Sequence, residues 1–223
     1  MIGVVIPAHN EERYLEACLL SVLTAAAHPT LAGEPVKIVV VLDSCSDDSL
    51  AIARRYPVEV VEVSAGNVGA ARAAGAQILI DADARWLACT DADSTVPFDW
   101  LAAQLAHQAD AVCGVVDVDD WSEYSTDVRQ RYEAAYSDRD DHRHIHGANL
   151  GVTRAAYVLA GGFPAMPCHE DVHLVQALQA LGANIAWSRS VRVRTSARMD
   201  FKAHGGFGSY LQTLAGGLEG GAA

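Results

Sequence analysis

Short apolar runs separated by longer, partly polar segments dominate the first half of the chain. The runs are rich in β-branched residues, a pattern typical of strands buried on both faces of a sheet. They cover Ile2–Ile6, Val36–Leu42, Val58–Val63 and Trp86–Cys89.

The segments between these runs have helical spacing of apolar residues. We expect Asn10 to cap the first helix, Ser46 to cap a second that runs to Arg55, and a third helix to cover Asn67–Ile80. Alternation of strands and helices with short connections predicts a Rossmann-like α/β fold, in which helices flank a mostly parallel central sheet.

The second half is less regular. The pattern predicts strands at Ala111–Val118, Ala148–Thr153, Ile185–Trp187 and Val191–Val193. It predicts helices at Pro97–His107, Ser125–Tyr136, Arg154–Ala160 and His169–Leu181. We expect one domain over residues 1–215, followed by a disordered Gly/Ala tail at 216–223.

Two carboxylates follow the fourth apolar run directly. Side chains at positions i and i+2 of an extended chain point the same way, so Asp91 and Asp93 can converge on one ligand. Hard cations such as Mg²⁺ or Mn²⁺ prefer such oxygen ligands. The alternative interpretation is that Asp91 and Asp93 only form an Asp-rich turn and bind no cation. The second Asp-Ala-Asp, Asp81 to Asp83, precedes the run and would lie at the opposite edge of the sheet, whereas ligands bind at the carboxyl ends of strands. Right-handed crossovers bring Pro7–Asn10 and Asp43 to the same edge as Asp91.

Composition narrows the class of protein. With 223 residues, 51% hydrophobic and 20% charged, the chain is globular, and its net charge of -12 argues against nucleic acid as a partner. Its odd number of cysteines, five, with no C-x-x-C pair favours reduced core residues and a cytoplasmic location. We expect no secretory signal and no transmembrane segment, since no apolar run approaches about 20 residues.

Five motifs occur in an order that resembles the family 2 glycosyltransferases with the GT-A fold. The first, V-I-P-A-H-N-E-E, covers residues 5–12 and follows Val4. The others are V-V-V-L-D-S at 39–44, G-N-V-G-A-A-R at 66–72, T-D-A-D at 90–93, and G-A-N-L-G-V-T-R at 147–154 followed by H-E-D at 169–171. The resemblance runs from residue 2 to about residue 195. It implies that the domain has a nucleotide-binding half at about 1–108 and an acceptor-binding half at about 109–215.

The resemblance implies a role for each matching position. It implies that the nucleotide sugar is contacted by Pro7, Ala8, Asn10, Glu11, Asp43, Arg72, Asp91 and Ala92, with Arg198 and Lys202 available for the diphosphate. It implies that Asp93 and Asp91 hold Mn²⁺ or Mg²⁺, with His204 as a candidate third ligand. Asp171, or else Glu170, would be the general base, and Gly147, Ala148 and Asn149 would lie beside the transferred sugar.

The activity implied is a metal-dependent, inverting transfer from a nucleoside-diphosphate sugar to a hydroxyl acceptor. A UDP-sugar is favoured and a GDP-sugar is the alternative donor. The family often has two acidic residues at the end of its second strand, but here Leu42 precedes Asp43, which leaves the identity of the base open. The absence of a Q-x-x-R-W motif argues against a processive synthase. The acceptor and the oligomeric state, including a homodimer, stay open.

Parts of the sequence also match other functions. His169 to His173 matches the H-E-x-x-H motif of zinc hydrolases, and a degenerate nucleotide-sugar-binding module would retain similar motifs without turnover. A nucleotidyltransferase would open with a Gly-rich phosphate loop, and a dinucleotide oxidoreductase with G-x-G-x-x-G; neither is present. His142, His144 and His146 alternate, which suits either a metal site or a loop that contacts solvent or the acceptor.

Overall fold

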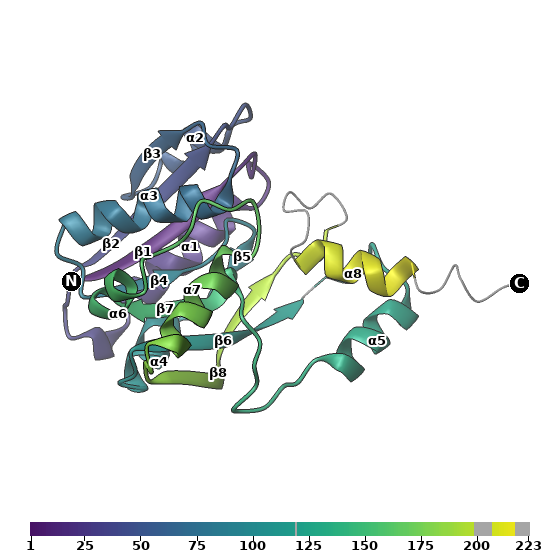
Figure 1. Cartoon of the computed structure of the whole chain (residues 1–223). Helices are drawn as coiled ribbons and strands as arrows, with labels where there is room; N and C mark the ends of the chain where they lie inside the picture. The colour runs from purple at the N-terminus through teal and green to yellow at the C-terminus, as the bar shows by residue number, and fades with distance from the viewer. Residues whose placement is uncertain (119, 199–206, 217–223) are drawn as a thin grey trace, which may run out of the picture.

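The computed structural model describes residues 1–118, 120–198 and 207–216, which form one eight-stranded mixed sheet flanked by helices (Figure 1). The strand order is β3-β2-β1-β4-β7-β6-β8-β5. The strands are β1 (Ile2–Ala8), β2 (Val36–Asp43), β3 (Glu59–Val63), β4 (Trp86–Cys89), β5 (Ser94–Thr95), β6 (Ala111–Val118), β7 (Leu150–Thr153) and β8 (Ile185–Thr195).

The predicted parallel arrangement of the first four strands is confirmed. β1 lies between β2 and β4 and is parallel to both, and β2 is parallel to β3. Beyond β4 the sheet becomes mixed, because β7 runs antiparallel to β4 and to β6, while β6 and β8 are parallel.

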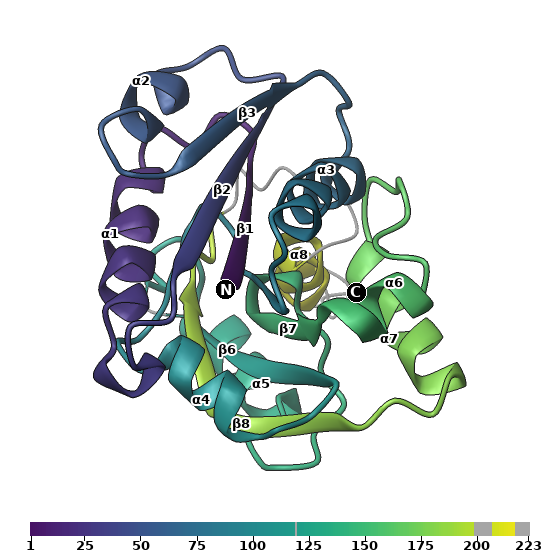
Figure 2. The ribbon, with the colours of Figure 1, turned by 90° about the vertical axis from the view of Figure 1, so that its left-hand side faces the viewer.

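Helices cover both faces of the sheet, as the alternating pattern predicts. Helices α1 (Leu15–Ala26), α2 (Ser49–Ala53) and α4 (Trp100–Ala106) lie on one face, and α3 (Val68–Asp81), α6 (Arg154–Leu159) and α7 (Glu170–Ala180) lie on the other (Figure 2). Each face has its own apolar core. On the first, Val4, Ile6 and Val40 of the sheet pack with Leu15, Leu19 and Trp100. On the second, Val5, Val39 and Val41 pack with Leu79, Leu174 and Leu178.

The first two helices begin later than predicted, and both predicted caps are wrong. Helix α1 begins at Leu15, because Asn10 has a left-handed backbone (φ 55°) and its Oδ1 accepts the N–H of Ser46 at 2.7 Å. Helix α2 begins at Ser49, whose N–H donates to Asp47 Oδ1 at 3.0 Å. Asn10 therefore ties two strand-end loops together instead of capping a helix. The predicted N-terminus of α3 is correct, since Asn67 Oδ1 accepts the N–H of Ala70 at 3.0 Å.

The two predicted late strands are parts of the single strand β8. The pairing of β6 with β8 shifts register between Gly114 and Val115, so that Gly114 faces Ser188 while Val115 faces Arg192. Asn149 fills this irregularity, as its Nδ2 donates to the carbonyls of Val115 at 2.8 Å and Val191 at 2.9 Å.

Helices α5 (Thr126–Ala135) and α8 (Phe207–Gly216) pack against each other away from the main body (Figure 1). Their small core consists of Tyr124, Val128, Tyr132, Ala197 and Leu211. The sequence pattern predicts α5, but α8 was not predicted. Lys202, His204 and the predicted tail from 217 onward lie outside the described residues.

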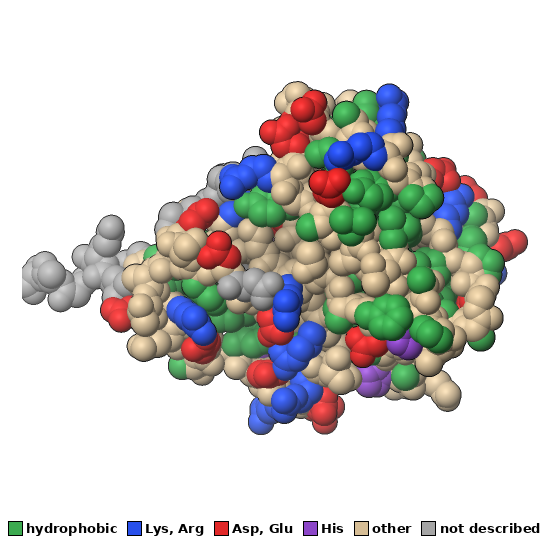
Figure 3. All heavy atoms as spheres, turned by 180° about the vertical axis from the view of Figure 1, so that it is seen from behind, with side chains coloured by type: hydrophobic (Ala, Val, Ile, Leu, Met, Phe, Trp, Pro, Cys, Tyr) green, Lys and Arg blue, Asp and Glu red, His purple; other side chains and the backbone are tan. Residues whose placement is uncertain are grey.

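The surface on the side opposite to Figure 1 mixes basic and acidic side chains with separate hydrophobic patches (Figure 3). Such interspersed charge is typical of a solvated surface. All five cysteines are free, and Cys18, Cys89 and Cys113 are buried. Within the described part of the chain, no helix has both the length and the apolar content needed to cross a bilayer.

Candidate active site

A cavity of about 870 Å³ opens at the carboxyl ends of β1, β2 and β4. Pro7, Asp43 and Asp91 line it from these three strand ends, so the predicted convergence is confirmed. Ala8, Glu11, Ala92 and Asp93 also line it. Asn10 does not, because its side chain is held by the neighbouring loop.

Asp43 organises the loop that leads into α3. Its Oδ1 accepts the N–H groups of Ala65 at 2.8 Å and Gly66 at 2.9 Å, and its Oδ2 accepts that of Asn67 at 2.8 Å. Burial raises the pKa of Asp43, but these backbone hydrogen bonds outweigh burial and hold the pKa below its ordinary value. Asp43 therefore shapes one end of the cavity as an anion, and its contact with a nucleobase stays a prediction.

Asp93 has two carboxylates, Asp91 and Glu11, and one cation, Arg198, as charged neighbours. Burial and the neighbouring charge of Asp91 raise the pKa of Asp93 to about 7, although Arg198 lowers it. Arg198 Nη2 is 3.3 Å from Asp93 Oδ2, and Arg198 Nη1 donates to Glu11 Oε2 at 2.6 Å. The guanidinium predicted to meet a diphosphate thus pairs with the buried Glu11 and the partly buried Asp93 at this edge of the cavity.

The donor set fits a hard divalent cation. Asp91 and Asp93 are only partly covered, with side-chain exposures of 34% and 18%, and both present carboxylate oxygens to the cavity. The described residues contain no group of three or more metal-ligating side chains, so a cation here would take its remaining ligands from phosphate or water.

Arg72 connects the two ends of the cavity. Its guanidinium is buried and forms ion pairs with Asp91 and Glu170. Burial lowers the pKa of Arg72, but the charges of Asp91 and Asp171 raise it above its ordinary value. Because Glu170 is 2% exposed and paired with Arg72, it holds this cation in place and is poorly suited to act as a base.

Asp171 is the carboxylate that faces the cavity from the start of α7. Its Oδ2 accepts the N–H of Gly147 at 2.7 Å, and its Oδ1 accepts that of Val172 at 2.8 Å. Gly147 also lies against the Arg72 guanidinium, so closely that a Cβ at this position would overlap it. Gly147 therefore holds Asp171 and contacts Arg72 in the same turn.

The three residues predicted beside the sugar divide into two groups. Gly147 and Ala148 line the cavity. Asn149 is fully buried and does not, because its Oδ1 accepts from Trp100 Nε1 at 3.0 Å and its Nδ2 bonds β6 and β8. The prediction that Asn149 lies beside the sugar is therefore wrong, because its side chain is bonded to the sheet and to Trp100 and does not reach the cavity.

The H-E-x-x-H segment does not have the geometry of a zinc site. His169 precedes α7 with a left-handed backbone (φ 65°), so the two histidines are not on consecutive turns of one helix. His173 is exposed and absent from the cavity lining, and Glu170 is paired with Arg72.

A group of aromatic residues lines the far side of the cavity. His144 and His146 were candidates from the sequence, whereas Tyr132 and Tyr136 from the α5 region and Tyr210 from α8 were not predicted. The alternation of histidines at 142, 144 and 146 was the available signal. Their rings stack, with centroids 5.3 Å apart for His142 and His144 and 5.9 Å apart for His144 and His146, in place of converging on a metal.

Several solved structures share this fold. TarS 1-349 of S. aureus in complex with UDP-GlcNAc superposes with a TM-score of 0.67 at 18% identity, over 92% of this chain and 61% of that one. The complex of TarS 1-349 with UDP has a TM-score of 0.67 at 17% identity, over 88% and 60% of the two chains. The mannosyltransferase PcManGT from Pyrobaculum calidifontis, in complex with GDP-Man and Mn²⁺, has a TM-score of 0.66 at 19% identity, over 100% and 65%.

The fold is therefore the GT-A fold of these glycosyltransferases, and the chain spans less than two thirds of each of these solved chains. No curated protein matches the chain by sequence. The sequence pattern described as Glycosyl transferase family 2 matches residues 3–159, which include the three strand ends, Arg72 and the Gly147 turn. With fold and sequence in agreement, the chain belongs to glycosyl transferase family 2.

Proposed function

We propose that the protein transfers a sugar from a nucleoside-diphosphate sugar to a hydroxyl acceptor, with inversion at the anomeric carbon and without processivity. The observation that carries this proposal is that Asp171 borders the same cavity as Asp91 and Asp93. Direct displacement needs a base for the acceptor proton and neutralisation of the leaving diphosphate, and these carboxylates supply a base and a cation site.

In the displacement, the acceptor oxygen forms a bond to the anomeric carbon while the bond from that carbon to the diphosphate oxygen breaks. The nucleoside diphosphate leaves with the electron pair, and the acceptor proton passes to Asp171. Each Asp171 oxygen accepts one backbone N–H, which fixes the carboxylate and leaves further lone pairs for the proton. A positioned base of this kind typically contributes roughly 10²- to 10⁴-fold in rate.

Asp91 and Asp93 are the residues that would hold Mn²⁺ or Mg²⁺. Such a cation acts as a Lewis acid for the developing diphosphate charge. Arg72 orients Asp91 from beneath, and Arg198 and Glu11 flank Asp93. Pro7, Ala8 and the loop held by Asp43 would enclose the nucleoside.

A UDP-sugar is the favoured donor and a GDP-sugar the alternative. The support is that the TarS structures hold UDP and UDP-GlcNAc, and that the PcManGT structure holds GDP-Man with Mn²⁺.

Thermal unfolding with UDP and with GDP, each with and without Mn²⁺, tests donor binding. A nucleotide at 100 times its dissociation constant adds about 2.7 kcal/mol, which raises the midpoint by roughly 5 to 10 °C for a chain of this size. Asp93→Ala should abolish the Mn²⁺-dependent shift. Asp81→Ala, from the second Asp-Ala-Asp at the opposite edge, is the matched control and should retain it.

Turnover separates an enzyme from a degenerate binding module. Release of UDP or GDP from the donor sugar should fall roughly 10²- to 10⁴-fold in Asp171→Asn while the thermal shift is unchanged. Nucleotide binding without any release by the unsubstituted protein would instead identify a binding module. Stabilisation by zinc alone would favour the zinc hydrolase.

A further inference from the structure

The side of the cavity opposite the strand-end carboxylates has a different chemical character. Its lining residues come from α5, from the segment between α5 and Gly147, and from α8; they are Tyr132, Ala135, Tyr136, Arg143, His144, Ile145, His146, Gly208 and Tyr210. We call these residues the aromatic wall. Among them Arg143 alone carries a full charge at neutral pH, and its guanidinium lies over the Trp187 ring at 5.0 Å. The wall lacks carboxylates, in contrast to the opposite side.

The histidines of the wall are neutral. Burial lowers the pKa of His144, and burial together with the neighbouring histidines lowers the pKa of His146 to about 3. Arg143 is thus the one charged side chain that the wall offers to a phosphorylated or otherwise anionic acceptor, and its guanidinium is already placed over the Trp187 ring.

The polar atoms of the central rings are engaged within the protein. The Tyr136 hydroxyl accepts the N–H of Val116 at 2.9 Å and lies 3.1 Å from His146 Nε2. His144 Nε2 is 3.1 Å from the Ser137 nitrogen and 3.2 Å from its oxygen. A sugar buried against these atoms would lose hydration of its hydroxyl groups without gaining matching partners.

The central rings also cover one another's faces. Tyr136 is parallel to His144, with centroids 4.1 Å apart and an interplanar angle of 2°. The ring centroid of Tyr136 is also 5.1 Å from that of Tyr132, and the ring centroid of His144 is 5.3 Å from that of His142. Tyr136 and His144 therefore cover one face of each other, and the edges of these stacked rings are a part that a further aromatic ring can meet. The edge of an aromatic ring is positive and attracts the negative face of another aromatic ring, the edge-to-face geometry.

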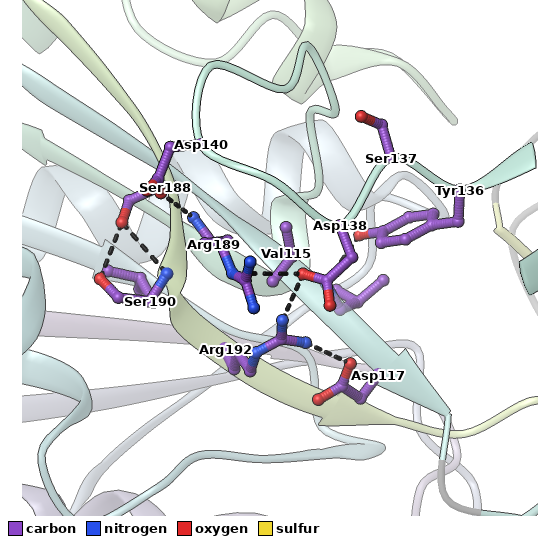
Figure 4. A network of polar contacts seen from close by, with 12 residues as sticks. Val115, Asp117, Tyr136, Ser137, Asp138, Asp140, Ser188, Arg189, Ser190 and Arg192 are labelled. Carbon is purple, nitrogen blue, oxygen red and sulfur yellow. Dashed lines mark hydrogen bonds and ion pairs between the residues drawn. The ribbon is translucent and has the colours of Figure 1, made fainter.

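The segment that carries His144 is fixed to the sheet by a polar network (Figure 4). Arg192 of β8 pairs with Asp117 of β6 at 2.7 Å and with Asp138 of the segment. The Arg189 N–H donates to Asp140 Oδ1 at 2.9 Å. The wall is therefore preorganised, which reduces the entropic cost of binding a rigid ligand.

We propose that the aromatic wall binds an uncharged aromatic alcohol as the acceptor, with its ring edge-to-face against Tyr136 and His144 and its hydroxyl directed toward Asp171. This proposal rests on the transfer reaction proposed above, and it adds the chemical class of the acceptor. The hydroxyl oxygen becomes the glycosidic oxygen, and its proton goes to Asp171.

Saturation-transfer NMR with three probes tests the proposal: 2-naphthol, methyl β-D-glucoside and glycerol 3-phosphate, each added to the protein with UDP and Mn²⁺. 2-Naphthol should bind most tightly. His144→Ala should weaken its binding about 3- to 10-fold, the range expected for loss of one aromatic pair, and His144→Phe should restore it. Phe98→Ala removes an exposed aromatic ring outside the cavity and should have no effect.

Tighter binding of the glucoside or of the phosphate, or equal binding of 2-naphthol by the unsubstituted protein and His144→Ala, would overturn the proposal. The UDP-induced thermal shift is measured in the same samples. An intact shift with no 2-naphthol binding refutes the acceptor class alone, whereas loss of the shift in the unsubstituted protein refutes the donor site.

Discussion

Arg72 is the buried cation on which the carboxylates of the cavity depend. It pairs with Asp91 and Glu170, and Asp171 contributes to its electrostatic stabilisation. Breaking a buried pair from one side leaves an uncompensated charge, which costs more than the pair itself contributes.

Arg72→Met should therefore lower the free energy of unfolding by about 3 to 5 kcal/mol. Arg85→Met is the matched control, because Arg85 pairs with Glu34 at the surface and such pairs contribute about 0 to 1 kcal/mol. Urea unfolding of both variants gives the comparison, and equal losses would contradict the role of Arg72. The double variant Arg72→Met with Glu170→Gln should regain part of the loss.

His146 should make stability depend on pH. Its folded-state pKa of about 3 lies well below the ordinary value of 6.5, so between these values the unfolded chain binds the proton that the folded chain does not. The contribution of His146 to stability, present above pH 6.5, should therefore be lost progressively as the pH falls toward 3, by up to about 1.4 kcal/mol per pH unit. Asp93, whose pKa is raised to about 7, contributes with the opposite sign, so the His146 contribution is measured as the difference between two variants.

Urea unfolding at pH 7.5, 6.0 and 5.0 measures this dependence. His146→Gln remains neutral throughout and should flatten the slope below pH 6.5, while His107→Gln, at the end of α4 and outside the cavity, should not. An unchanged slope in His146→Gln would show that other groups carry the effect.

At the scale of elements, the junction of η2 (Gly147–Asn149) with β6 and β8 supports the cavity floor. The Asn149 carboxamide satisfies two carbonyls at the register shift and accepts the indole N–H of Trp100. Gly114 permits this approach, because a Cβ there would overlap the carboxamide.

Asn149→Ala should leave three buried polar groups without partners and lower the free energy of unfolding by about 2 to 4 kcal/mol. Chemical unfolding followed by tryptophan fluorescence measures the loss. Gln77→Ala removes an exposed hydrogen bond to Asp81 and should cost less than about 0.5 kcal/mol. A cost for Asn149→Ala within that range would contradict the assigned role.

The sequence predicts strands β1, β2 and β4 well, because a strand buried on both faces is a continuous apolar run, which can be recognised without knowledge of its tertiary contacts. Asp43 and Asp91 follow such runs, so their meeting at one edge is predictable from the order of elements. The partners of Arg72 and Asn149 are not, since both pairings depend on residues distant in the chain. The same limit explains why Asn10 appeared to be a helix cap: its actual partner, Ser46, lies in a different loop.

At the scale of the whole molecule, two large cores lie on the two faces of the central sheet, while α5 and α8 share one small core. Elements with few buried apolar contacts open at lower free energy than the body of a domain. The unit of α5 and α8 should therefore be the less stable part of the described structure. The sequence pattern did not predict helix α8, because its sequence contains two glycines and its apolar residues become buried only against α5, which is distant in the chain.

Hydrogen exchange should reveal this difference. Amides of α5 and α8 should exchange faster than those of β1 and α3, and Leu211→Ala, which removes a fully buried contact between them, should increase exchange in both helices. The UDP-induced thermal shift should be retained. Acceleration of β1 to the same extent would instead indicate that the whole chain unfolds as one unit.

The contact between Gly147 and Arg72 has a consequence for how this protein can be altered. Gly147 donates its N–H to Asp171, and a Cβ at this position would overlap the guanidinium of Arg72, which pairs with Asp91. Any side chain added at Gly147 would thus disturb Asp171 and the Arg72–Asp91 pair together, and its effects should be strongly non-additive with changes at Arg72. If the aromatic wall binds the acceptor as proposed, substitutions at positions 143–146 should alter acceptor selectivity without altering nucleotide binding, whereas substitutions at position 147 should alter both.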